Sequence, residues 1–181
     1  MDRNIQTQFE NLHSTDRNSQ FEAFQEIMKA TEEEVDWAYE VWEQLIDDLD
    51  DKDPHHRSRA AQFLAHLAIS DPDGRMLTDF SAVWAVTKDE KFVTARHSLQ
   101  AIWRVGLAGS KQKDLVVSHL VDRFRKCFEE KNHTLIRFDI IQGLSYLYNE
   151  VKDIQIKQKA LELIETEEQD KYRNKYAKLW S

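Results

Sequence analysis

The apolar positions of this chain form helical stripes that recur at intervals of close to 40 residues. An arginine opens each stripe, and apolar or small residues follow mostly at +3, +4, +7 and +10, as with Ile140, Ile141, Leu144 and Leu147 after Arg137. The phrase starts five times, at spacings of 40, 39, 41 and 36 residues: Arg17, Arg57, Arg96, Arg137 and Arg173. The match is weaker after Arg17 and Arg96. Spacings of three and four residues indicate one face of an α-helix, and a recurrence of this length is typical of repeat arrays.

A second apolar stripe lies between successive arginine stripes, so each unit is predicted to be an antiparallel helix pair. In the second unit, Thr31 and Glu34 have the spacing of a capping box and are expected to start the outer helix. The inner helix is expected to begin at Asp53-Pro54 and to run to about Ser70. We therefore expect one all-α domain, residues 1–181, an α-α superhelix of about four to five pairs, with units near 1–30, 31–70, 74–108, 110–150 and 152–181.

The stretch DPHHRSRAAQFL, residues 53–64, resembles the inner-helix signature of HEAT repeats. That signature is an Asp-Pro turn, then an arginine, then small and apolar residues leading to a leucine. Through the repeated arginines the resemblance covers nearly the whole chain, although only one unit has the Asp-Pro and Trp or Phe replaces smaller residues at several core positions. The resemblance implies a HEAT-like α-solenoid. It implies little about activity, because such arrays serve as adaptors, transport receptors, enzyme subunits and a few enzymes.

Composition agrees with a helical protein and indicates a compartment. Only 4 glycines and 2 prolines occur in 181 residues, which argues against β architecture. No apolar run approaches the roughly 20 residues needed to cross a bilayer, and the polar N-terminus is unlike a secretory signal. The single cysteine, Cys127, is expected to pack as a small hydrophobe, and a cytoplasmic location is predicted. The net charge of −8 is uneven, since residues 1–53 hold 16 acidic and 4 basic side chains.

The repeated arginines are predicted to be structural. Each opens its own apolar stripe and so lies near the core face, where a guanidinium must be paired. Carboxylates lie nearby in sequence: Asp53 for Arg57, Asp89 for Arg96 and Asp170 for Arg173. We therefore expect a ladder of bidentate bonds that ties successive turns together, formed by Arg17, Arg57, Arg96, Arg137 and Arg173. Gly143, in the middle of an inner helix, is expected to mark a close helix crossing.

The inner helices are expected to line a concave groove, as in other solenoids. Positions opposite the core stripe are the candidate partner-binding residues: Arg59, Gln62, His66, His97, Arg104, Gln142 and Tyr146. With Glu22 and Glu26 in the first unit and Lys175 and Lys178 in the last, the groove is expected to change from acidic to mildly basic along its length. An ordinary solvated helix face is the alternative interpretation.

No motif for catalysis, metal or cofactor binding is found. The seven histidines form no His-Glu-x-x-His or Cys/His cluster, and no glycine-rich loop occurs. No catalytic residue is assigned, and a tertiary constellation remains open. The leading hypothesis is therefore a non-catalytic scaffold or adaptor that binds a protein or peptide, with no membrane association.

Three further hypotheses stay open. One is a nucleic-acid-binding or repair protein similar to the HEAT-like alkylpurine DNA glycosylases, which Arg59 and Arg104 favour and a pI near 5.4 opposes. Another is an enzyme that handles small molecules, like the HEAT-type bilin lyases, with Trp and Phe rows lining its pocket. The third is homodimerisation through the C-terminal helix, which ends at Trp180-Ser181.

Overall fold

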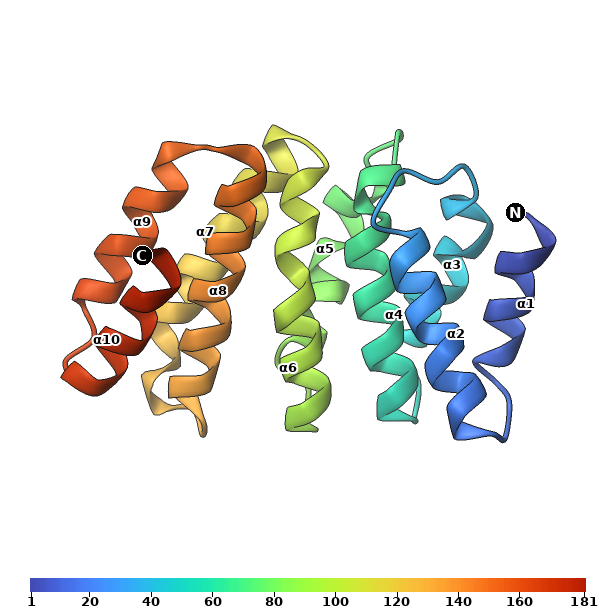
Figure 1. Cartoon of the computed structure of the whole chain (residues 1–181), viewed down its shortest axis with the longest axis horizontal. Coiled ribbons are helices and arrows are strands. Elements are labelled where there is room, and N and C mark those ends of the chain that lie inside the picture. Colours follow the sequence, from blue (N-terminus) through green and yellow to red (C-terminus); the bar gives the residue numbers. More distant parts are fainter.

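The computed structural model describes all 181 residues, and all its regular elements are helical (Figure 1). The all-α prediction is confirmed. The ten α-helices are α1 (Arg3–Asn11), α2 (Arg17–Ala30), α3 (Ala38–Asp48), α4 (Pro54–Leu67), α5 (Arg75–Val86), α6 (Phe92–Ala101), α7 (Ser110–Lys126), α8 (His133–Val151), α9 (Ile154–Glu165) and α10 (Asp170–Ala177). Short 3-10 turns extend four of them, at Ala68–Ser70, Ile102–Leu107, Cys127–Glu129 and Lys178–Trp180.

The helices pack as consecutive pairs, each odd-numbered helix against the even-numbered helix that follows it. Helices α2, α4, α6, α8 and α10 also pack against one another in turn, and so do α3, α5, α7 and α9. In Figure 1, α2, α4, α6 and α8 lie nearer the viewer than α3, α5 and α7, and the chain runs from right to left. We call the helices with even numbers the even-numbered layer and the others the odd-numbered layer. The predicted inner helices form the even-numbered layer.

Aspartate caps start several helices. Asp53 has extended backbone and its carboxylate accepts the N–H of His55, with Pro54 at the first helical position, as predicted. Asp16 and Asp153 cap α2 and α9 in the same way. These caps satisfy backbone N–H groups that have no partner within the helix.

The capping box predicted at Thr31 and Glu34 is wrong. Thr31 ends α2 instead, and its buried hydroxyl donates to the carbonyl of Ile27 at 2.8 Å. Helix α3 begins only at Ala38, after Trp37, which is 5% exposed. A threonine that closes one helix and a threonine that opens the next look alike in sequence, because either hydroxyl can bond to nearby backbone.

One hydrophobic core runs between the layers from Ile5 to Tyr176. The stripe after Arg137 is fully buried, with Ile140 and Leu144 both at 0% exposure. Cys127 is also fully buried among these side chains, as predicted, and burial raises the pKa of its thiol. The core therefore extends across every helix pair.

The close approach predicted at Gly143 is found at Gly106. A Cβ added to Gly143 would lie 3.5 Å from the Cβ of Trp103, which is ordinary contact. A Cβ on Gly106 would lie 2.8 Å from the Cδ2 of Leu147 and 3.1 Å from the Cγ1 of Val116, which is too close. The tightest contact between the third helix pair (α5 and α6) and the fourth (α7 and α8) is therefore made at Gly106, in the 3-10 turn that follows α6.

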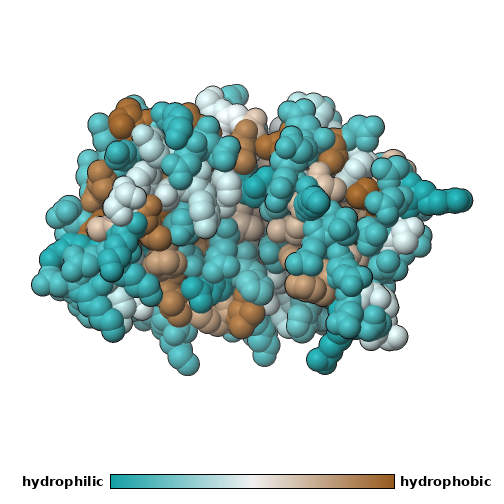
Figure 2. All heavy atoms as spheres, viewed as in Figure 1, coloured by the Kyte–Doolittle hydropathy of each residue, from teal (hydrophilic) through white to brown (hydrophobic).

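None of the helices combines the length and the apolar character needed to cross a bilayer. Figure 2 shows that the face seen in Figure 1 is covered mainly by hydrophilic residues, with apolar spots scattered between them.

Candidate binding pocket on the even-numbered layer

Three of the repeated arginines reach a carboxylate of the next helix pair. Arg57 donates from Nε to Oδ2 of Asp89 at 2.7 Å and from Nη2 to Oδ1 at 3.0 Å. Arg96 pairs with Asp139 of α8 at 2.9 and 3.4 Å. Arg137 pairs with a carboxylate before α10, donating from Nη1 to Glu167 at 2.8 Å. The local partners expected for Arg57 and Arg96 are therefore not the ones used. Arg173 does pair with Asp170 of its own helix.

An acidic residue recurs three positions before the first residue of each later even-numbered helix: Asp51, Asp89, Glu130 and Glu167. Two of them meet the arginine of the preceding pair. Glu130 instead pairs with the buried Arg123 of α7, accepting from its Nε at 2.9 Å and from its Nη2 at 3.0 Å. Arg96, the arginine of the preceding pair, therefore pairs with Asp139 and not with Glu130. This acidic register is visible in the sequence as a carboxylate before each of these helices.

Arg17 does not belong to this ladder, which corrects the prediction. It is exposed and has neither an ion pair nor a side-chain hydrogen bond. The acid in the matching position, Asp51, accepts the backbone N–H of Asp53 at 2.7 Å and lies 3.4 Å from Nδ1 of His56. Arg17 is therefore left free, and it lines a cavity.

This cavity has a volume of about 820 Å³ and lies between α2, α4 and α6, with the loop before α2 closing one side. We call it the Arg17 pocket. Its charged and titratable lining residues are two arginines, four histidines and one acid, namely Arg17, Arg59, His13, His55, His56, His97 and Asp53. A volume of this size is within the range of ligand pockets. The pocket therefore combines room for a ligand with an excess of cationic groups.

Arg59 is a cation without a counter-ion. Its Nη1 donates to the carbonyl of Leu12 at 3.0 Å, and its Nη2 lies 3.5 Å from Oε1 of Gln20. No carboxylate forms an ion pair with it. Burial lowers the pKa of Arg59, against the smaller opposite effect of Asp53. A guanidinium still carries its charge at neutral pH, so this part-buried group can accept an anion.

The single acid of the pocket is already engaged. Asp53 accepts the backbone N–H of His55 at 2.8 Å, and Nδ1 of His55 lies 3.0 Å from the same oxygen. The backbone bond and the imidazole bond lower the pKa of Asp53, so it stays ionised. On its other side lies His56, whose ring meets that of His13 edge to face at 5.9 Å. Asp53 thus orders the helix start and forms no ion pair with either arginine.

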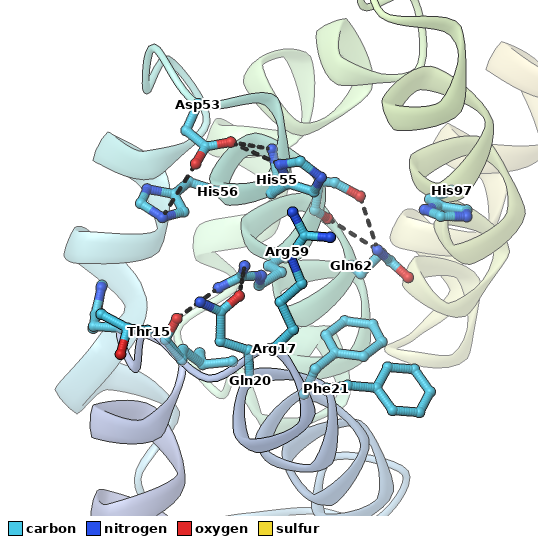
Figure 3. Close-up of a pocket in the computed structure, with 14 residues that line it drawn as sticks. Thr15, Arg17, Gln20, Phe21, Asp53, His55, His56, Arg59, Gln62 and His97 are labelled. Atoms are coloured by element: carbon cyan, nitrogen blue, oxygen red, sulfur yellow. Dashed lines mark hydrogen bonds and ion pairs between the residues drawn. The ribbon is translucent and has the colours of Figure 1, made fainter.

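Figure 3 shows how the lining residues lie. Arg17 extends from α2 into the pocket toward α4, beside Arg59. Phe21 and His97 lie on the side of the pocket opposite Thr15 and His56. Phe21 is 59% exposed, a large apolar side chain left open to solvent. The pocket therefore offers an apolar surface next to its cations.

The sequence comparisons add no relative. Neither protein-family models nor curated proteins give a match to this chain. The function of the pocket must therefore be argued from its geometry.

Three of the seven predicted partner-binding residues line the Arg17 pocket: Arg59, Gln62 and His97. Gln62 holds its place by donating to the carbonyl and hydroxyl of Ser58. His66 is a correction, because it is only 6% exposed and its Nδ1 lies 3.2 Å from the hydroxyl of Thr31. Burial lowers the pKa of His66 to about 3. Helix α4 is covered at this turn by the end of α2, so its outward side is buried.

The other three predicted residues, Arg104, Gln142 and Tyr146, lie outside the pocket. Arg104 lies over the Trp103 ring at 5.3 Å, and its Nε is buried without a hydrogen-bond partner. The Trp103 ring is 5.5 Å from that of Tyr146, which is 46% exposed. Gln142 is partly exposed on the same helix as Tyr146. Arg104, Trp103 and Tyr146 therefore form a second cluster.

The predicted acidic end of the groove is not found in the pocket. Glu22 and Glu26 are exposed on α2 but do not line it. Besides helix positions that the wheel describes, the pocket is lined by residues of the loop before α2 and of the start of α4, which a helical wheel of the inner stripes leaves out.

Four histidines line the pocket, and the hydrogen bond between an imidazole and a hydroxyl that the structure contains is that of His66 and Thr31, which is buried outside it. No group of three or more His, Cys, Asp or Glu side chains is placed to hold a metal ion. The features that distinguish the pocket are its charge and its apolar surface.

Proposed function

We propose that this protein is a non-catalytic interaction module, a HEAT-like α-solenoid that binds a protein or peptide segment on its even-numbered layer. The observation that carries the proposal is the Arg17 pocket, an open cavity whose two arginines have no carboxylate partner. We place the module in a reducing cytoplasm, because its one cysteine is a buried free thiol.

The pair-by-pair packing supports the solenoid. In repeat arrays each unit contacts its neighbours and the stacked inner helices form the recognition surface. Here the even-numbered helices contact one another in sequence order. The pairs of Arg57 with Asp89 and Arg137 with Glu167 connect one unit to the next. The predicted concave face corresponds to the even-numbered layer in this proposal.

The side chains on this layer are of the types that anchor protein interfaces. Arginine and tyrosine are enriched among the residues that contribute most to binding energy. Arg17 and Arg59 lie in the pocket, and Arg104 and Tyr146 lie in the second cluster on the same layer. A peptide that contacts both clusters would cross α2, α4, α6 and α8.

Nucleic acid is the second candidate, and the unpaired arginines are the observation that favours it. The pI near 5.4 and the excess of acids in residues 1–53 oppose it, because a polyanion would be repelled by most of that segment. A salt titration separates the two. Binding through many phosphates weakens steeply with salt, whereas a peptide held by one ion pair and apolar contacts changes little.

A display selection tests the proposal. Random peptides are selected against the wild-type protein, and hydrogen exchange is then measured with and without a selected peptide. We expect slower exchange in residues 12–30 and in the first turns of α4. The same exchange measurement on Arg125→Ala is the control. It should give the same protection as the wild type, because Arg125 is exposed and unpaired on α7 of the odd-numbered layer. Protection confined to the odd-numbered helices, or no selected peptide, would contradict the proposal.

A further inference from the structure

We infer that the Arg17 pocket recognises one carboxylate side chain, an aspartate or glutamate, beside an apolar residue of the bound segment. The inference rests on the proposed function and names the chemistry of its ligand.

The charge of the lining favours a single negative charge. Arg17 and Arg59 carry two positive charges, and Asp53 carries one negative charge. The lining therefore has one arginine more than it has acids. One carboxylate on the ligand balances that arginine. The chain outside the pocket is acidic, with 16 acidic against 4 basic side chains in residues 1–53.

The charge of the lining also sets the upper limit on ligand charge. Exposed charges act over a Debye length of about 8 Å at physiological salt, so a carboxylate inside the pocket is governed by the arginines beside it. A phosphoryl group at neutral pH carries close to two negative charges, which is more than the excess of arginines over acids in the lining. A nucleic acid places further phosphates outside the pocket, against the acidic side chains. The charge balance therefore selects an acidic side chain over both.

The two arginines have the donors that a carboxylate needs. Arg17 has all its N–H groups free, and its side chain extends into the pocket (Figure 3). Arg59 is fixed at Nη1 by the carbonyl of Leu12, so its guanidinium is already placed before a ligand arrives. A planar guanidinium binds a carboxylate through two parallel hydrogen bonds. The competing acid, Asp53, is held by His55 on its own helix.

The apolar part of the lining indicates the second feature of the ligand, an apolar residue beside the carboxylate. Phe21 is 59% exposed, and Phe24 and Leu12 line the same pocket. An apolar side chain next to the carboxylate covers Phe21 and removes both surfaces from water. A segment in which an acidic residue neighbours a leucine or phenylalanine meets both surfaces at once.

The test uses the peptide that the display selection returns, acetylated and amidated so that side chains supply its only carboxylates. Its acidic residue is kept as Glu, changed to Gln or changed to phosphoserine, and binding is measured by fluorescence anisotropy. We expect the Glu peptide to bind at least ten-fold tighter than the Gln peptide, and tighter than the phosphoserine peptide. Equal binding of Glu and Gln, or tighter binding of phosphoserine or of an oligothymidylate, overturns the inference.

Protein variants locate the contact. Arg17→Ala should reduce affinity for the Glu peptide to that of the Gln peptide, whereas Arg125→Ala, which removes an equal charge from α7, should leave it unchanged. Arg59→Lys keeps the charge without the planar fork and should weaken the Glu peptide several-fold. Undiminished binding by Arg17→Ala overturns the inference. If selected peptides protect the even-numbered layer but show no preference for an acid, the inference fails and the proposed function stands. If no peptide is selected, both fail.

Discussion

Arg17 and Arg57 hold the same place in their repeats and have opposite surroundings. The side chain of Arg57 is 13% exposed and forms a bidentate pair with Asp89. Arg17 is exposed and unpaired. The difference lies in the next helix pair, where Asp89 is available to Arg57 while Asp51 is engaged with His56 and the backbone of Asp53. The same position of the repeat therefore holds an ion-paired arginine in one unit and an unpaired arginine in another.

The first residue-scale prediction concerns Arg57. Replacing it with Ala leaves Asp89, 8% exposed, without its partner. Removing one member of a buried pair is strongly destabilising, and for this partly open pair we expect a loss of about 2–3 kcal/mol. The melting temperature should fall by roughly 5–10 °C. Arg17→Ala is the matched control and should melt like the wild type. A melting temperature unchanged by Arg57→Ala would refute the structural role of the ladder.

The second prediction concerns His66. Burial lowers its pKa to about 3, whereas the unfolded ring titrates near 6.5. Between these values the unfolded chain binds a proton that the folded protein does not, so the free energy of unfolding falls as pH falls. One proton contributes at most about 1.4 kcal/mol per pH unit.

Urea unfolding of the wild type and His66→Gln at pH 7, 6 and 5 checks this. The wild type should lose stability over this range more steeply than His66→Gln. Parallel losses in the two proteins would show that His66 does not carry the effect.

At the scale of elements, the apolar stripes predicted the helices well because period and capping are local properties. Asp53-Pro54 starts α4 as expected. Contacts between units were not predictable in the same way. The stripe places Arg57 at the core face, but the partner is selected by how α6 is placed against α4, which brings Asp89 rather than Asp53 to the guanidinium.

Two glycines give an element-scale prediction with opposite signs. Gly143→Ala adds a methyl at ordinary contact distance from Trp103 and should stabilise α8 by roughly 0.5–1 kcal/mol. Gly106→Ala places a methyl 2.8 Å from the Cδ2 of Leu147 and should destabilise by about 1–3 kcal/mol. Thermal unfolding of the two variants measures both. A stabilised Gly106→Ala would mean that Leu147 moves aside without cost.

At the scale of the whole molecule, the predicted charge of the groove was wrong at its N-terminal end. Glu22 and Glu26 implied an acidic end, yet the Arg17 pocket at that end is lined by two arginines and by neither glutamate. Arg59, Gln62 and His97 were predictable because they lie opposite the stripe. Arg17 and the residues of the loop before α2 were not, because the wheel assigns the former to the core and does not describe loops.

The central claim is that one arginine register serves stability in the middle of the array and binding at its N-terminal end. The most direct test is the shift in melting temperature that a saturating selected peptide causes in three proteins, wild type, Arg57→Ala and Arg17→Ala. A ligand at about 100 times its Kd stabilises the state that binds it by about 2.7 kcal/mol. We predict a similar upward shift for the wild type and Arg57→Ala, and a shift of at most about half that size for Arg17→Ala, whose affinity is at least ten-fold lower. An equal shift in Arg17→Ala, or its loss in Arg57→Ala alone, would contradict the account.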